Sequence, residues 1–422
     1  MAKVEPKRRG NADLTSAVKA AEERFKAENP KSRLRWTEAA LSMPGGNTRT
    51  VLHYTPYPLA IARGEGAKLT DIDGHTYTDF LGEYTAGLYG HSNPVLKAAI
   101  DRAVEDGVVL GGPNRYEGEL ARLMCQRFPS LELVRFCNSG TEANLYAISA
   151  ARMFTGRERV MVFEGAYHGG VFYFGQTKPP TNAPFPYVIA SYNDIEGTLA
   201  AIERHAGELA AIVIEPMMGG GGAIAAETPF LEALRQAATK HGIVLIFDEV
   251  MTSRLAPGGL QEKLGVIPDM TSFGKYLGGG MTFGAFGGRR DIMRRFDPYE
   301  PDAVSHAGTF NNNVLTMAAG VAGLAEIYTP EVAVQLNRTG DRFRERLNAV
   351  IARYGAAMQV LGVGSISASI SRRGRSGGRR TPGRATPGRP RARPTCRSSS
   401  ISTCWRPANT WPGAGSCRCP CR

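Results

Sequence analysis

Long apolar runs are missing from this 422-residue sequence. None reaches the roughly 18–20 residues that a helix needs to cross a bilayer, so a membrane-spanning protein is not expected. The first eleven residues are polar and basic and lack the apolar core of a secretory signal peptide. We therefore expect a cytoplasmic protein. Hydrophobic residues still make up 42% of the chain, which allows one large α/β domain and a smaller one.

Cysteine is nearly absent from the part of the sequence that reads as folded protein. Only Cys125 and Cys137 lie there. Two cysteines in so long a stretch do not suggest a disulfide framework. The other five crowd the end of the chain, at Cys396, Cys404, Cys417, Cys419 and Cys421.

Lysine, aspartate and glutamate are missing from residues 371–422, which hold thirteen arginines. The net charge of +12 originates in this stretch. Of the 51 basic residues, 38 remain without it, against 39 acidic ones, so the rest of the chain has a net charge of −1. A nearly neutral body argues against nucleic acid as the partner, because nucleic-acid binding needs a basic surface.

Through the middle of the chain, short apolar runs alternate with stretches of helical spacing. The runs of strand length are 134–137, 160–163, 210–216 and 243–250, and the helical stretches are about 142–155, 229–241, 313–328 and 331–354. Nearer the start, residues 14–27 have helical spacing and 68–80 alternate around Asp73-Gly74 as in a hairpin. Strands that are apolar on both faces predict a mainly parallel sheet covered by helices.

Asp248 ends the apolar run 243–247. An acid at the carboxyl end of a buried parallel strand faces the crevice where α/β sheets bind ligands. There it could hold a proton on a heterocyclic nitrogen, bind a metal, or simply cap a turn. A P-loop ATPase is excluded, because its Gly-x-x-x-x-Gly-Lys-Ser/Thr loop is absent. The only Gly-Lys pair is Gly274-Lys275, with Tyr276 after it and Asp269 in place of the first glycine.

Lys275 lies just before Gly278-Gly279-Gly280. Glycines let the backbone approach a ligand closely. A lysine that is desolvated in such a place has a lowered pKa and becomes a nucleophile toward aldehydes. Taken alone, a lysine in a loop is more often solvated.

Two further stretches could bind parts of a ligand. Asn138-Ser139-Gly140-Thr141-Glu142 opens a helix, and amides and hydroxyls at a helix start form an anion site. The same pattern also fits an ordinary helix cap. Tyr167, on a loop after the run 160–163, could stack on a planar ring or pack on the surface.

Together, these four features match one cofactor. Pyridoxal phosphate (PLP) needs an amine for its aldehyde, an acid for its ring nitrogen, an anion site for its phosphate and an aromatic side chain against its ring. The order along the chain is anion loop, aromatic residue, strand-end Asp248 and then Lys275, 27 residues later. This order is that of fold-type I PLP enzymes. No metal is expected.

The chain resembles the class III aminotransferases, close to the glutamate-1-semialdehyde 2,1-aminomutase group, and most of all the bacterial β-amino-acid (β-phenylalanine) aminotransferases. The resemblance runs from about residue 14 to 365. It is carried by MPGGNTR (43–49), GHSNP (90–94), NSGTEAN (138–144), AYHGG (166–170), IEPM (214–217), FDEVMTSRLAPGGL (247–260), GKYLGGGMTFGAFGG (274–288) and HAGTFNNNVLTMAAG (306–320).

The resemblance implies a role for each matching residue. Lys275 would form the aldimine and move the proton, Asp248 would bind the ring nitrogen, and Tyr167 and Val250 would lie on either side of the ring. The phosphate would be held by Ser139, Gly140, Thr141 and, from the neighbouring subunit of a homodimer, Thr309. Glu215 would lie near the cofactor. Arg49 would bind a substrate carboxylate, unless it is a surface loop residue.

The resemblance also implies four regions and an activity. The regions are 1–67, contributing to the small domain and substrate entrance; 68–305, the large PLP-binding domain; 306–367, the start of the C-terminal small domain; and 368–422, a tail. The activity would be amino transfer from a β-amino acid, which could carry an aryl group, to a keto acid. An aminomutase, which returns the amine to the neighbouring carbon of the same molecule, is the alternative.

The tail departs from the family from about residue 366. It could be a disordered basic segment that binds nucleic acid, or its last cysteines could bind a metal. We favour a third interpretation, a shifted reading frame in GC-rich DNA, because such a shift over-produces Arg, Gly, Pro, Ser, Cys and Trp and removes Lys, Asp and Glu. It would leave the small domain incomplete, with an apolar face uncovered, and the protein could then fold poorly and be inactive.

Overall fold

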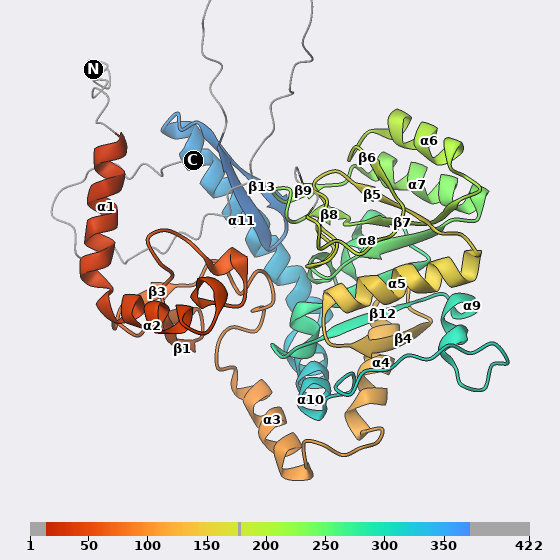
Figure 1. Ribbon diagram of the computed structural model, residues 1–422, viewed down its shortest axis with the longest axis horizontal. Helices are drawn as coiled ribbons and strands as arrows, with labels where there is room; N and C mark the ends of the chain where they lie inside the picture. The colour runs from red at the N-terminus through yellow and green to blue at the C-terminus, as the bar shows by residue number, and fades with distance from the viewer. Residues whose placement is uncertain (1–13, 176–178, 372–422) are drawn as a thin grey trace, which may run out of the picture. The chain divides into compact units, whose positions relative to one another are not determined.

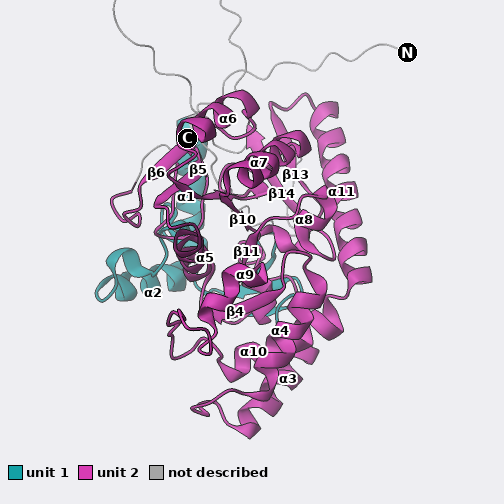
Figure 2. Ribbon diagram, turned by 90° about the vertical axis from the view of Figure 1, so that its right-hand side faces the viewer, with its two compact units in different colours: residues 1–81, 90–93, 402–422 teal, residues 82–89, 94–401 magenta. Residues whose placement is uncertain are grey.

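The computed structural model describes residues 14–175 and 179–371. The described residues form two compact units, which Figure 2 shows in different colours. Unit 1 holds residues 14–81 and 90–93, and unit 2 holds 82–89 and 94–371. Among these residues, we find no helix that is long and apolar enough to cross a membrane.

Unit 1 begins with two helices and ends with a small antiparallel sheet. Its elements are α1 (Leu14–Glu28), α2 (Pro30–Ala40), the 3₁₀ turns Pro44–Gly46 and Thr50–Leu52, and strands β1 (Ile61–Glu65), β2 (Lys68–Asp71) and β3 (Thr76–Thr78). The predicted hairpin is confirmed, with Lys68 opposite Thr78 and Gly74 at a φ of 100° in the turn. Because β1 pairs with β2, the boundary predicted between 67 and 68 falls inside a hairpin.

A seven-stranded sheet forms the centre of unit 2 (Figure 1). Its strands are β4 (Leu133–Cys137), β5 (Arg159–Phe163), β6 (Tyr187–Ala190), β7 (Leu209–Ile214), β10 (Val244–Asp248), β11 (Met270–Gly274) and β12 (Gly284–Gly288). Their order is β4-β12-β11-β10-β7-β5-β6, and only β12 runs antiparallel to its neighbours. The predicted mainly parallel α/β fold is confirmed.

Helices cover both faces of this sheet. Helix α5 (Gly140–Thr155) packs across β7, β10, β11 and β12, and α7 (Thr228–His241) packs on β10 from the opposite face (Figure 1). The other helices of this part are α3 (Pro94–Asp106), α4 (Arg115–Arg127), α6 (Ile195–Arg204), α8 (Gly259–Leu264) and α9 (Arg290–Met293). Every residue of β7 and β10 is buried, as expected for strands covered on two sides.

Strand β12 was not predicted, because its sequence GAFGG lacks the side chains that usually mark a strand. The glycines are there for close packing. A Cβ on Gly284 would lie 2.2 Å from the carbonyl oxygen of Ser139. The glycine strand therefore lets the loop before α5 lie directly against the sheet.

The last part of unit 2 starts a further layer. It contains α10 (Val314–Ala322), a π turn at Gly323–Ile327, α11 (Pro330–Arg353), and the antiparallel pair β13 (Met358–Val363) and β14 (Ile366–Ser371). Earlier in the chain, the short strands β8 (Met217–Met218) and β9 (Ile224–Ala225) form a second pair. The tail predicted to start at 368 thus starts inside β14. Val350 on α11 is 52% exposed, and Tyr354, which follows the last residue of this helix, is 75% exposed. The metal, nucleic-acid and reading-frame interpretations of the tail concern residues 372–422, which lie outside the described residues.

Candidate active site

The site lies at the carboxyl ends of the parallel strands of unit 2. Tyr167 follows β5, Glu215 follows β7, Asp248 ends β10, and Lys275 follows β11 directly. Ser139 follows β4 by two residues. The carboxyl ends of parallel strands meet at one edge of a sheet, so the fold gathers residues from positions 139 to 275 at one place.

Asp248 is a buried carboxylate with three hydrogen bonds. Its Oδ2 accepts from Asn144 Nδ2 and from the ring of His168, each at 2.8 Å, and its Oδ1 accepts from the Val250 backbone N–H at 3.0 Å. A carboxylate offers about four lone-pair positions, so one remains for a further donor. Asn144 and His168 were not assigned a role from the sequence.

The charge of Asp248 also acts on its neighbour. Burial alone would lower the pKa of His168, but the hydrogen bond and the negative charge of Asp248 raise it above the ordinary value of 6.5. His168 therefore serves as a hydrogen-bond donor to Asp248. This arrangement fixes the carboxylate in one orientation.

Lys275 has a φ of 58°, in the left-handed region that side chains other than glycine rarely occupy. It opens the 3₁₀ turn Lys275–Gly278, and its Nζ donates to Tyr84 O at 2.5 Å and to Thr85 Oγ1 at 3.0 Å. Burial lowers the pKa of its amine from 10.5 to about 8, although the charges of Asp248 and Glu215 oppose this shift. The lowered pKa increases the neutral fraction of the amine near neutral pH, as a nucleophilic lysine requires.

The lowered pKa gives a pH prediction. In the cofactor-free protein, labelling of Lys275 by an amine-directed reagent should rise with pH to a midpoint near 8. Mass spectrometry of the Lys275 peptide at a series of pH values measures this midpoint. The control is the same peptide in unfolded protein, where the midpoint should return to the ordinary lysine value near 10.5. Equal midpoints in the folded and unfolded protein would contradict the predicted burial.

The loop at 138–141 both caps α5 and lies against the lysine strand. Ser139 Oγ accepts from the Glu142 backbone N–H at 3.2 Å, so the ordinary cap is present. A Cβ on Gly140 would lie 2.8 Å from Val250, and one on Gly274 would lie 3.2 Å from it. Val250 therefore packs between the start of α5 and the end of β11, as a residue beneath a shared ligand would.

Thr141 connects this loop to the one that follows β5. Its Oγ1 accepts from the Gly170 backbone N–H at 3.2 Å. Tyr167 is half exposed, and its ring meets Tyr173 edge-on at 6.1 Å. The two features bring the predicted anion loop and the predicted aromatic residue to the same edge of the sheet.

Glu215 holds two loops at this edge. Its Oε2 accepts from the Tyr167 backbone N–H at 3.1 Å, and its Oε1 accepts from the Gly219 backbone N–H at 3.0 Å. Burial raises the pKa of Glu215 to about 7, with the nearby His168 opposing the shift. Glu215 thus shapes the loop that carries Tyr167.

Two predicted residues lie apart from this cluster in the chain. Arg49 belongs to unit 1, where it is exposed and precedes the 3₁₀ turn Thr50–Leu52. Thr309 is exposed on the segment between β12 and α10. That segment is attached near the start of α5, because Asn138 Nδ2 donates to Asn311 Oδ1 at 3.0 Å.

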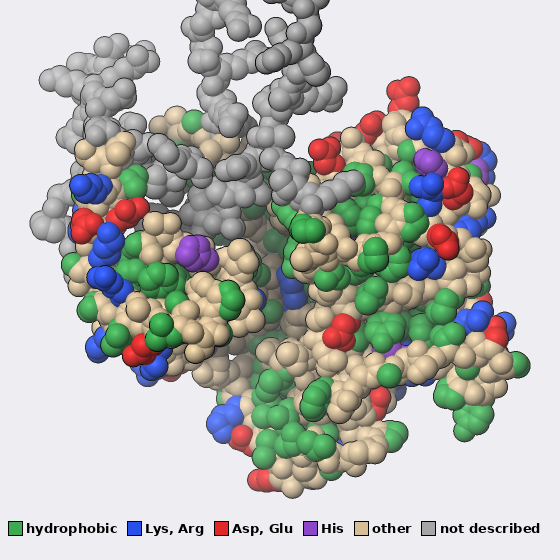
Figure 3. Space-filling model, viewed as in Figure 1, with side chains coloured by type: hydrophobic (Ala, Val, Ile, Leu, Met, Phe, Trp, Pro, Cys, Tyr) green, Lys and Arg blue, Asp and Glu red, His purple; other side chains and the backbone are tan. Residues whose placement is uncertain are grey.

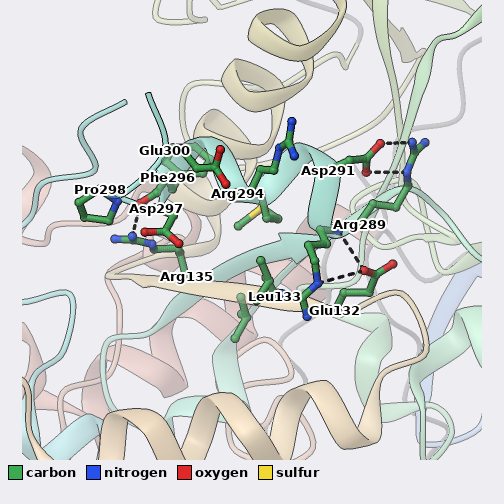
Figure 4. Close-up of a pocket in the computed structure, with 13 residues that line it drawn as sticks. Glu132, Leu133, Arg135, Arg289, Asp291, Arg294, Phe296, Asp297, Pro298 and Glu300 are labelled. Carbon is green, nitrogen blue, oxygen red and sulfur yellow. Dashed lines mark hydrogen bonds and ion pairs between the residues drawn. The ribbon is translucent and has the colours of Figure 1, made fainter. Parts of the chain in front are cut away.

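A hollow of about 750 Å³ lies at the other end of the sheet (Figure 4). It lies beside the first residues of β4 and the residues after β12, and its lining includes Glu132, Arg289 and Arg294 but none of the predicted site residues. Arg289 is paired with Asp269 and Asp291. Because the strand-end amine and carboxylates lie at the opposite edge, we place the chemistry there.

Charges of both signs are mixed on the face that Figure 3 shows. Between α6 and α7, Lys240 and His241 lie 2.7 and 3.0 Å from Glu203. A surface of mixed sign does not offer the continuous positive patch that binds a phosphate backbone. This face gives no support to a nucleic-acid interface.

The groups at the strand ends fit PLP. Lys275 supplies an amine with a lowered pKa, and Asp248 retains a lone-pair position for a ring N–H. The start of the sixteen-residue helix α5, with Gly140 pressed against Val250, offers backbone N–H groups to a phosphate.

Comparison with known proteins finds similar proteins over most of the chain. The aminotransferase class-III family matches residues 51–375. A β-phenylalanine transaminase of Variovorax paradoxus is 53% identical over 356 residues, which cover 84% of this chain and 82% of that protein. A glutamate-1-semialdehyde 2,1-aminomutase of Lachnoclostridium phytofermentans is 37% identical over 356 residues, covering 80% and 83%.

Two solved structures that are similar to this chain are also aminotransferases. The crystal structure of a β-phenylalanine aminotransferase from Variovorax paradoxus has a TM-score of 0.84 at 53% identity, covering 86% of this chain and 84% of that one. A transaminase with PLP bound has a TM-score of 0.76 at 34% identity, covering 81% and 84%.

Proposed function

The chain belongs to the class-III aminotransferase family, a family of PLP enzymes, and on this basis we propose that it transfers the amino group of a β-amino acid to a keto acid. The observation that carries the substrate class is the 53% identity to a β-phenylalanine transaminase. The strand-end amine and carboxylate of unit 2 carry the chemistry, with Lys275 and Asp248 as catalytic residues.

When bound, PLP supplies an aldehyde and an electron-withdrawing ring. Asp248 would keep a proton on the ring nitrogen. Its three hydrogen bonds occupy three of its acceptor positions, and the fourth would accept the ring N–H. Asn144 and His168 would hold the carboxylate in place while it does so. A protonated ring nitrogen would stabilise the negative charge that develops when a C–H bond is broken, and the role of the Asp248 carboxylate would be to keep that proton in place.

Lys275 would have two tasks. Its amine would hold the cofactor aldehyde between reactions. Once displaced by the substrate amine, the Lys275 amine would accept the proton from the substrate carbon that carries the amino group. It would then deliver this proton to the carbon of the cofactor's former aldehyde group. A pKa of about 8 suits both steps, because proton transfer is most efficient when the pKa lies near the working pH.

The remaining predicted residues would position the cofactor. Ser139, Gly140 and Thr141 would bind its phosphate, with the hydroxyl of Thr141 shared with Gly170. Tyr167 and Val250 would lie against the two faces of the ring. Glu215 would act through the backbone of Tyr167, which it holds at 3.1 Å.

Two proposals reach beyond unit 2 of one chain. Thr309, exposed on its segment, would bind the phosphate in the neighbouring subunit, so the active form would be a homodimer. Arg49 would bind the substrate carboxylate. Equilibrium sedimentation tests the dimer, and an increase in KM on Arg49→Ala without loss of cofactor tests the carboxylate role. We also keep the expectation of a cytoplasmic location, which cell fractionation would test.

A two-substrate assay tests the proposed activity. With a β-aryl β-amino acid as donor, we expect turnover only when a keto acid is also present, and one amino acid formed per keto acid consumed. Arg294→Ala, a change in the hollow at the other end of the sheet, serves as a control and should keep the activity. An aminomutase would instead turn over a single substrate without any keto acid, and that outcome would replace the proposal with the alternative.

The tail is tested separately. If it is a basic nucleic-acid-binding segment, deletion of residues 371–422 should abolish a salt-dependent affinity for DNA. If it results from a shifted frame, the coding DNA should read through codons 360–422 in another frame with lysine, aspartate and glutamate restored. The family match ends at residue 375, just inside the arginine-rich stretch 371–422.

A further inference from the structure

Three consecutive residues of unit 2 have left-handed backbones although none is glycine. The φ angles are 48° for Glu83, 52° for Tyr84 and 77° for Thr85. Such conformations are disfavoured for L-amino acids with side chains, and they persist only where the surroundings hold them. Their clustering in functional sites makes the segment 83–85 worth following to its contacts.

One contact that holds the segment comes from Arg254. Its Nη1 donates to Thr85 O at 3.2 Å. Arg254 ends the 3₁₀ turn Thr252–Arg254 that follows β10, and its own carbonyl accepts from Asn337 Nδ2 at 2.8 Å and from the hydroxyl of Tyr328. Arg254 is therefore fixed by groups from α11 and from the turn before it.

The segment in turn holds the catalytic lysine. Lys275 Nζ donates to Tyr84 O and Thr85 Oγ1, 2.5 and 3.0 Å away. A neutral amine has two N–H bonds and one lone pair. Two acceptors that take both N–H bonds leave the lone pair pointing in one direction, so the contacts orient the amine as a base.

We infer that Tyr84 and Thr85 form a holding site for the Lys275 amine whenever it is not bonded to the cofactor, and that Arg254 is a positioning residue that keeps this site in shape. The inference rests on the proposed function in one respect, that Lys275 is displaced during turnover. The strained backbone explains why the carbonyl of Tyr84 and the side chain of Thr85 can face the same nitrogen.

Thr85→Val tests the holding site, with Thr85→Ser as the matched variant. Valine keeps the branched shape and removes the hydroxyl, whereas serine keeps the hydroxyl and removes the methyl group. Because an acceptor stabilises the charged amine, its loss should lower the labelling midpoint of Lys275 in the cofactor-free full chain by about half a pH unit or more. Arg254→Met also removes a charge that favours the neutral amine, so its positioning role is tested in a double variant: Thr85→Val should lower the midpoint less in the Arg254→Met background than in the parent protein.

Turnover gives a second readout that a merely structural role would not change. For Thr85→Val we expect kcat to fall about tenfold with little change in KM, since proton transfer slows. The kinetic isotope effect, measured with deuterium on the carbon that bears the amino group, should be larger in Thr85→Val than in the parent enzyme. Thr85→Ser should behave like the parent enzyme in both assays.

The outcomes separate this inference from the proposed function. A Thr85→Val protein with the parental labelling midpoint and the parental isotope effect would overturn the holding site. A shifted midpoint in a protein that performs no amino transfer would keep the holding site and overturn the proposed reaction. If Arg254→Met does not fold, the threonine pair still decides the question.

Discussion

Replacing Lys275 with alanine is expected to lower kcat/KM for amino transfer by about 10⁴-fold or more, because covalent attachment of the cofactor and proton transfer are lost together. Among the described residues, no other strand of the central sheet is followed directly by a lysine. Steady-state kinetics with a β-amino acid and a keto acid measures the loss. The visible absorption of the bound cofactor should change at the same time.

Two controls keep this experiment specific. Lys263→Ala removes an exposed lysine of α8 and should leave the activity unchanged. A small primary amine added to the Lys275→Ala protein should restore part of the activity, because it replaces the missing base without a chain attached. Full activity of Lys275→Ala, or equal losses in both variants, would remove Lys275 from the mechanism.

Asp248→Asn is expected to lower kcat/KM by about 10²–10⁴-fold while the protein still folds. Asparagine has nearly the same shape but lacks the charge that would keep the ring nitrogen protonated. The same loss of charge should lower the pKa of Lys275 below about 8, since Asp248 now raises it. Labelling of Lys275 against pH in the cofactor-free variant measures that second effect independently of turnover.

Asp269→Asn is the matched control. Asp269 is also a buried carboxylate beside β10 and β11, but it lies at the opposite end of these strands and pairs with Arg235 and Arg289. Its replacement should lower thermal stability and leave the labelling midpoint of Lys275 near 8. An Asp248→Asn protein with parental kcat/KM would show that the ring nitrogen needs no charged partner here.

The sequence was sufficient to predict the strand-end positions of this site. Asp248 follows a run of apolar residues, so its position on the sheet follows from the end of the run, whereas Glu215 came from the family resemblance. Lys275 was recognised from its glycine-rich surroundings and its order in the chain. Both arguments use short stretches of sequence, in which local pattern and tertiary position coincide.

The partners of these residues could not be predicted in the same way. Asn144 and Asp248 are 104 positions apart, and Thr85 and Lys275 are 190 apart. Neither contact leaves a periodic or compositional signal, because each depends on how several strands and loops are packed. Strand β12 was missed for a related reason. Its glycines are required because neighbouring backbones lie too close for a Cβ, and that closeness is defined only in the folded chain.

The C-terminal part shows where a sequence argument stops. The resemblance was expected to end near residue 365, but the family match extends to residue 375, and β14 runs to Ser371, paired along its length with β13. Alternating small and apolar residues in 366–371 were enough to continue a strand beyond that point. Val350 on α11 and Tyr354 just after the helix are exposed, and the expectation of an uncovered apolar face stays a prediction.

The most direct test of the account is to locate the cofactor on the chain. The purified full-length protein would be incubated with PLP, reduced with borohydride so that the bond to the protein becomes permanent, digested, and analysed by mass spectrometry. We predict a single modified peptide, carrying the label on Lys275, and none in Lys275→Ala. A label on another lysine, or an unmodified Lys275 in soluble folded protein, would contradict the site described above.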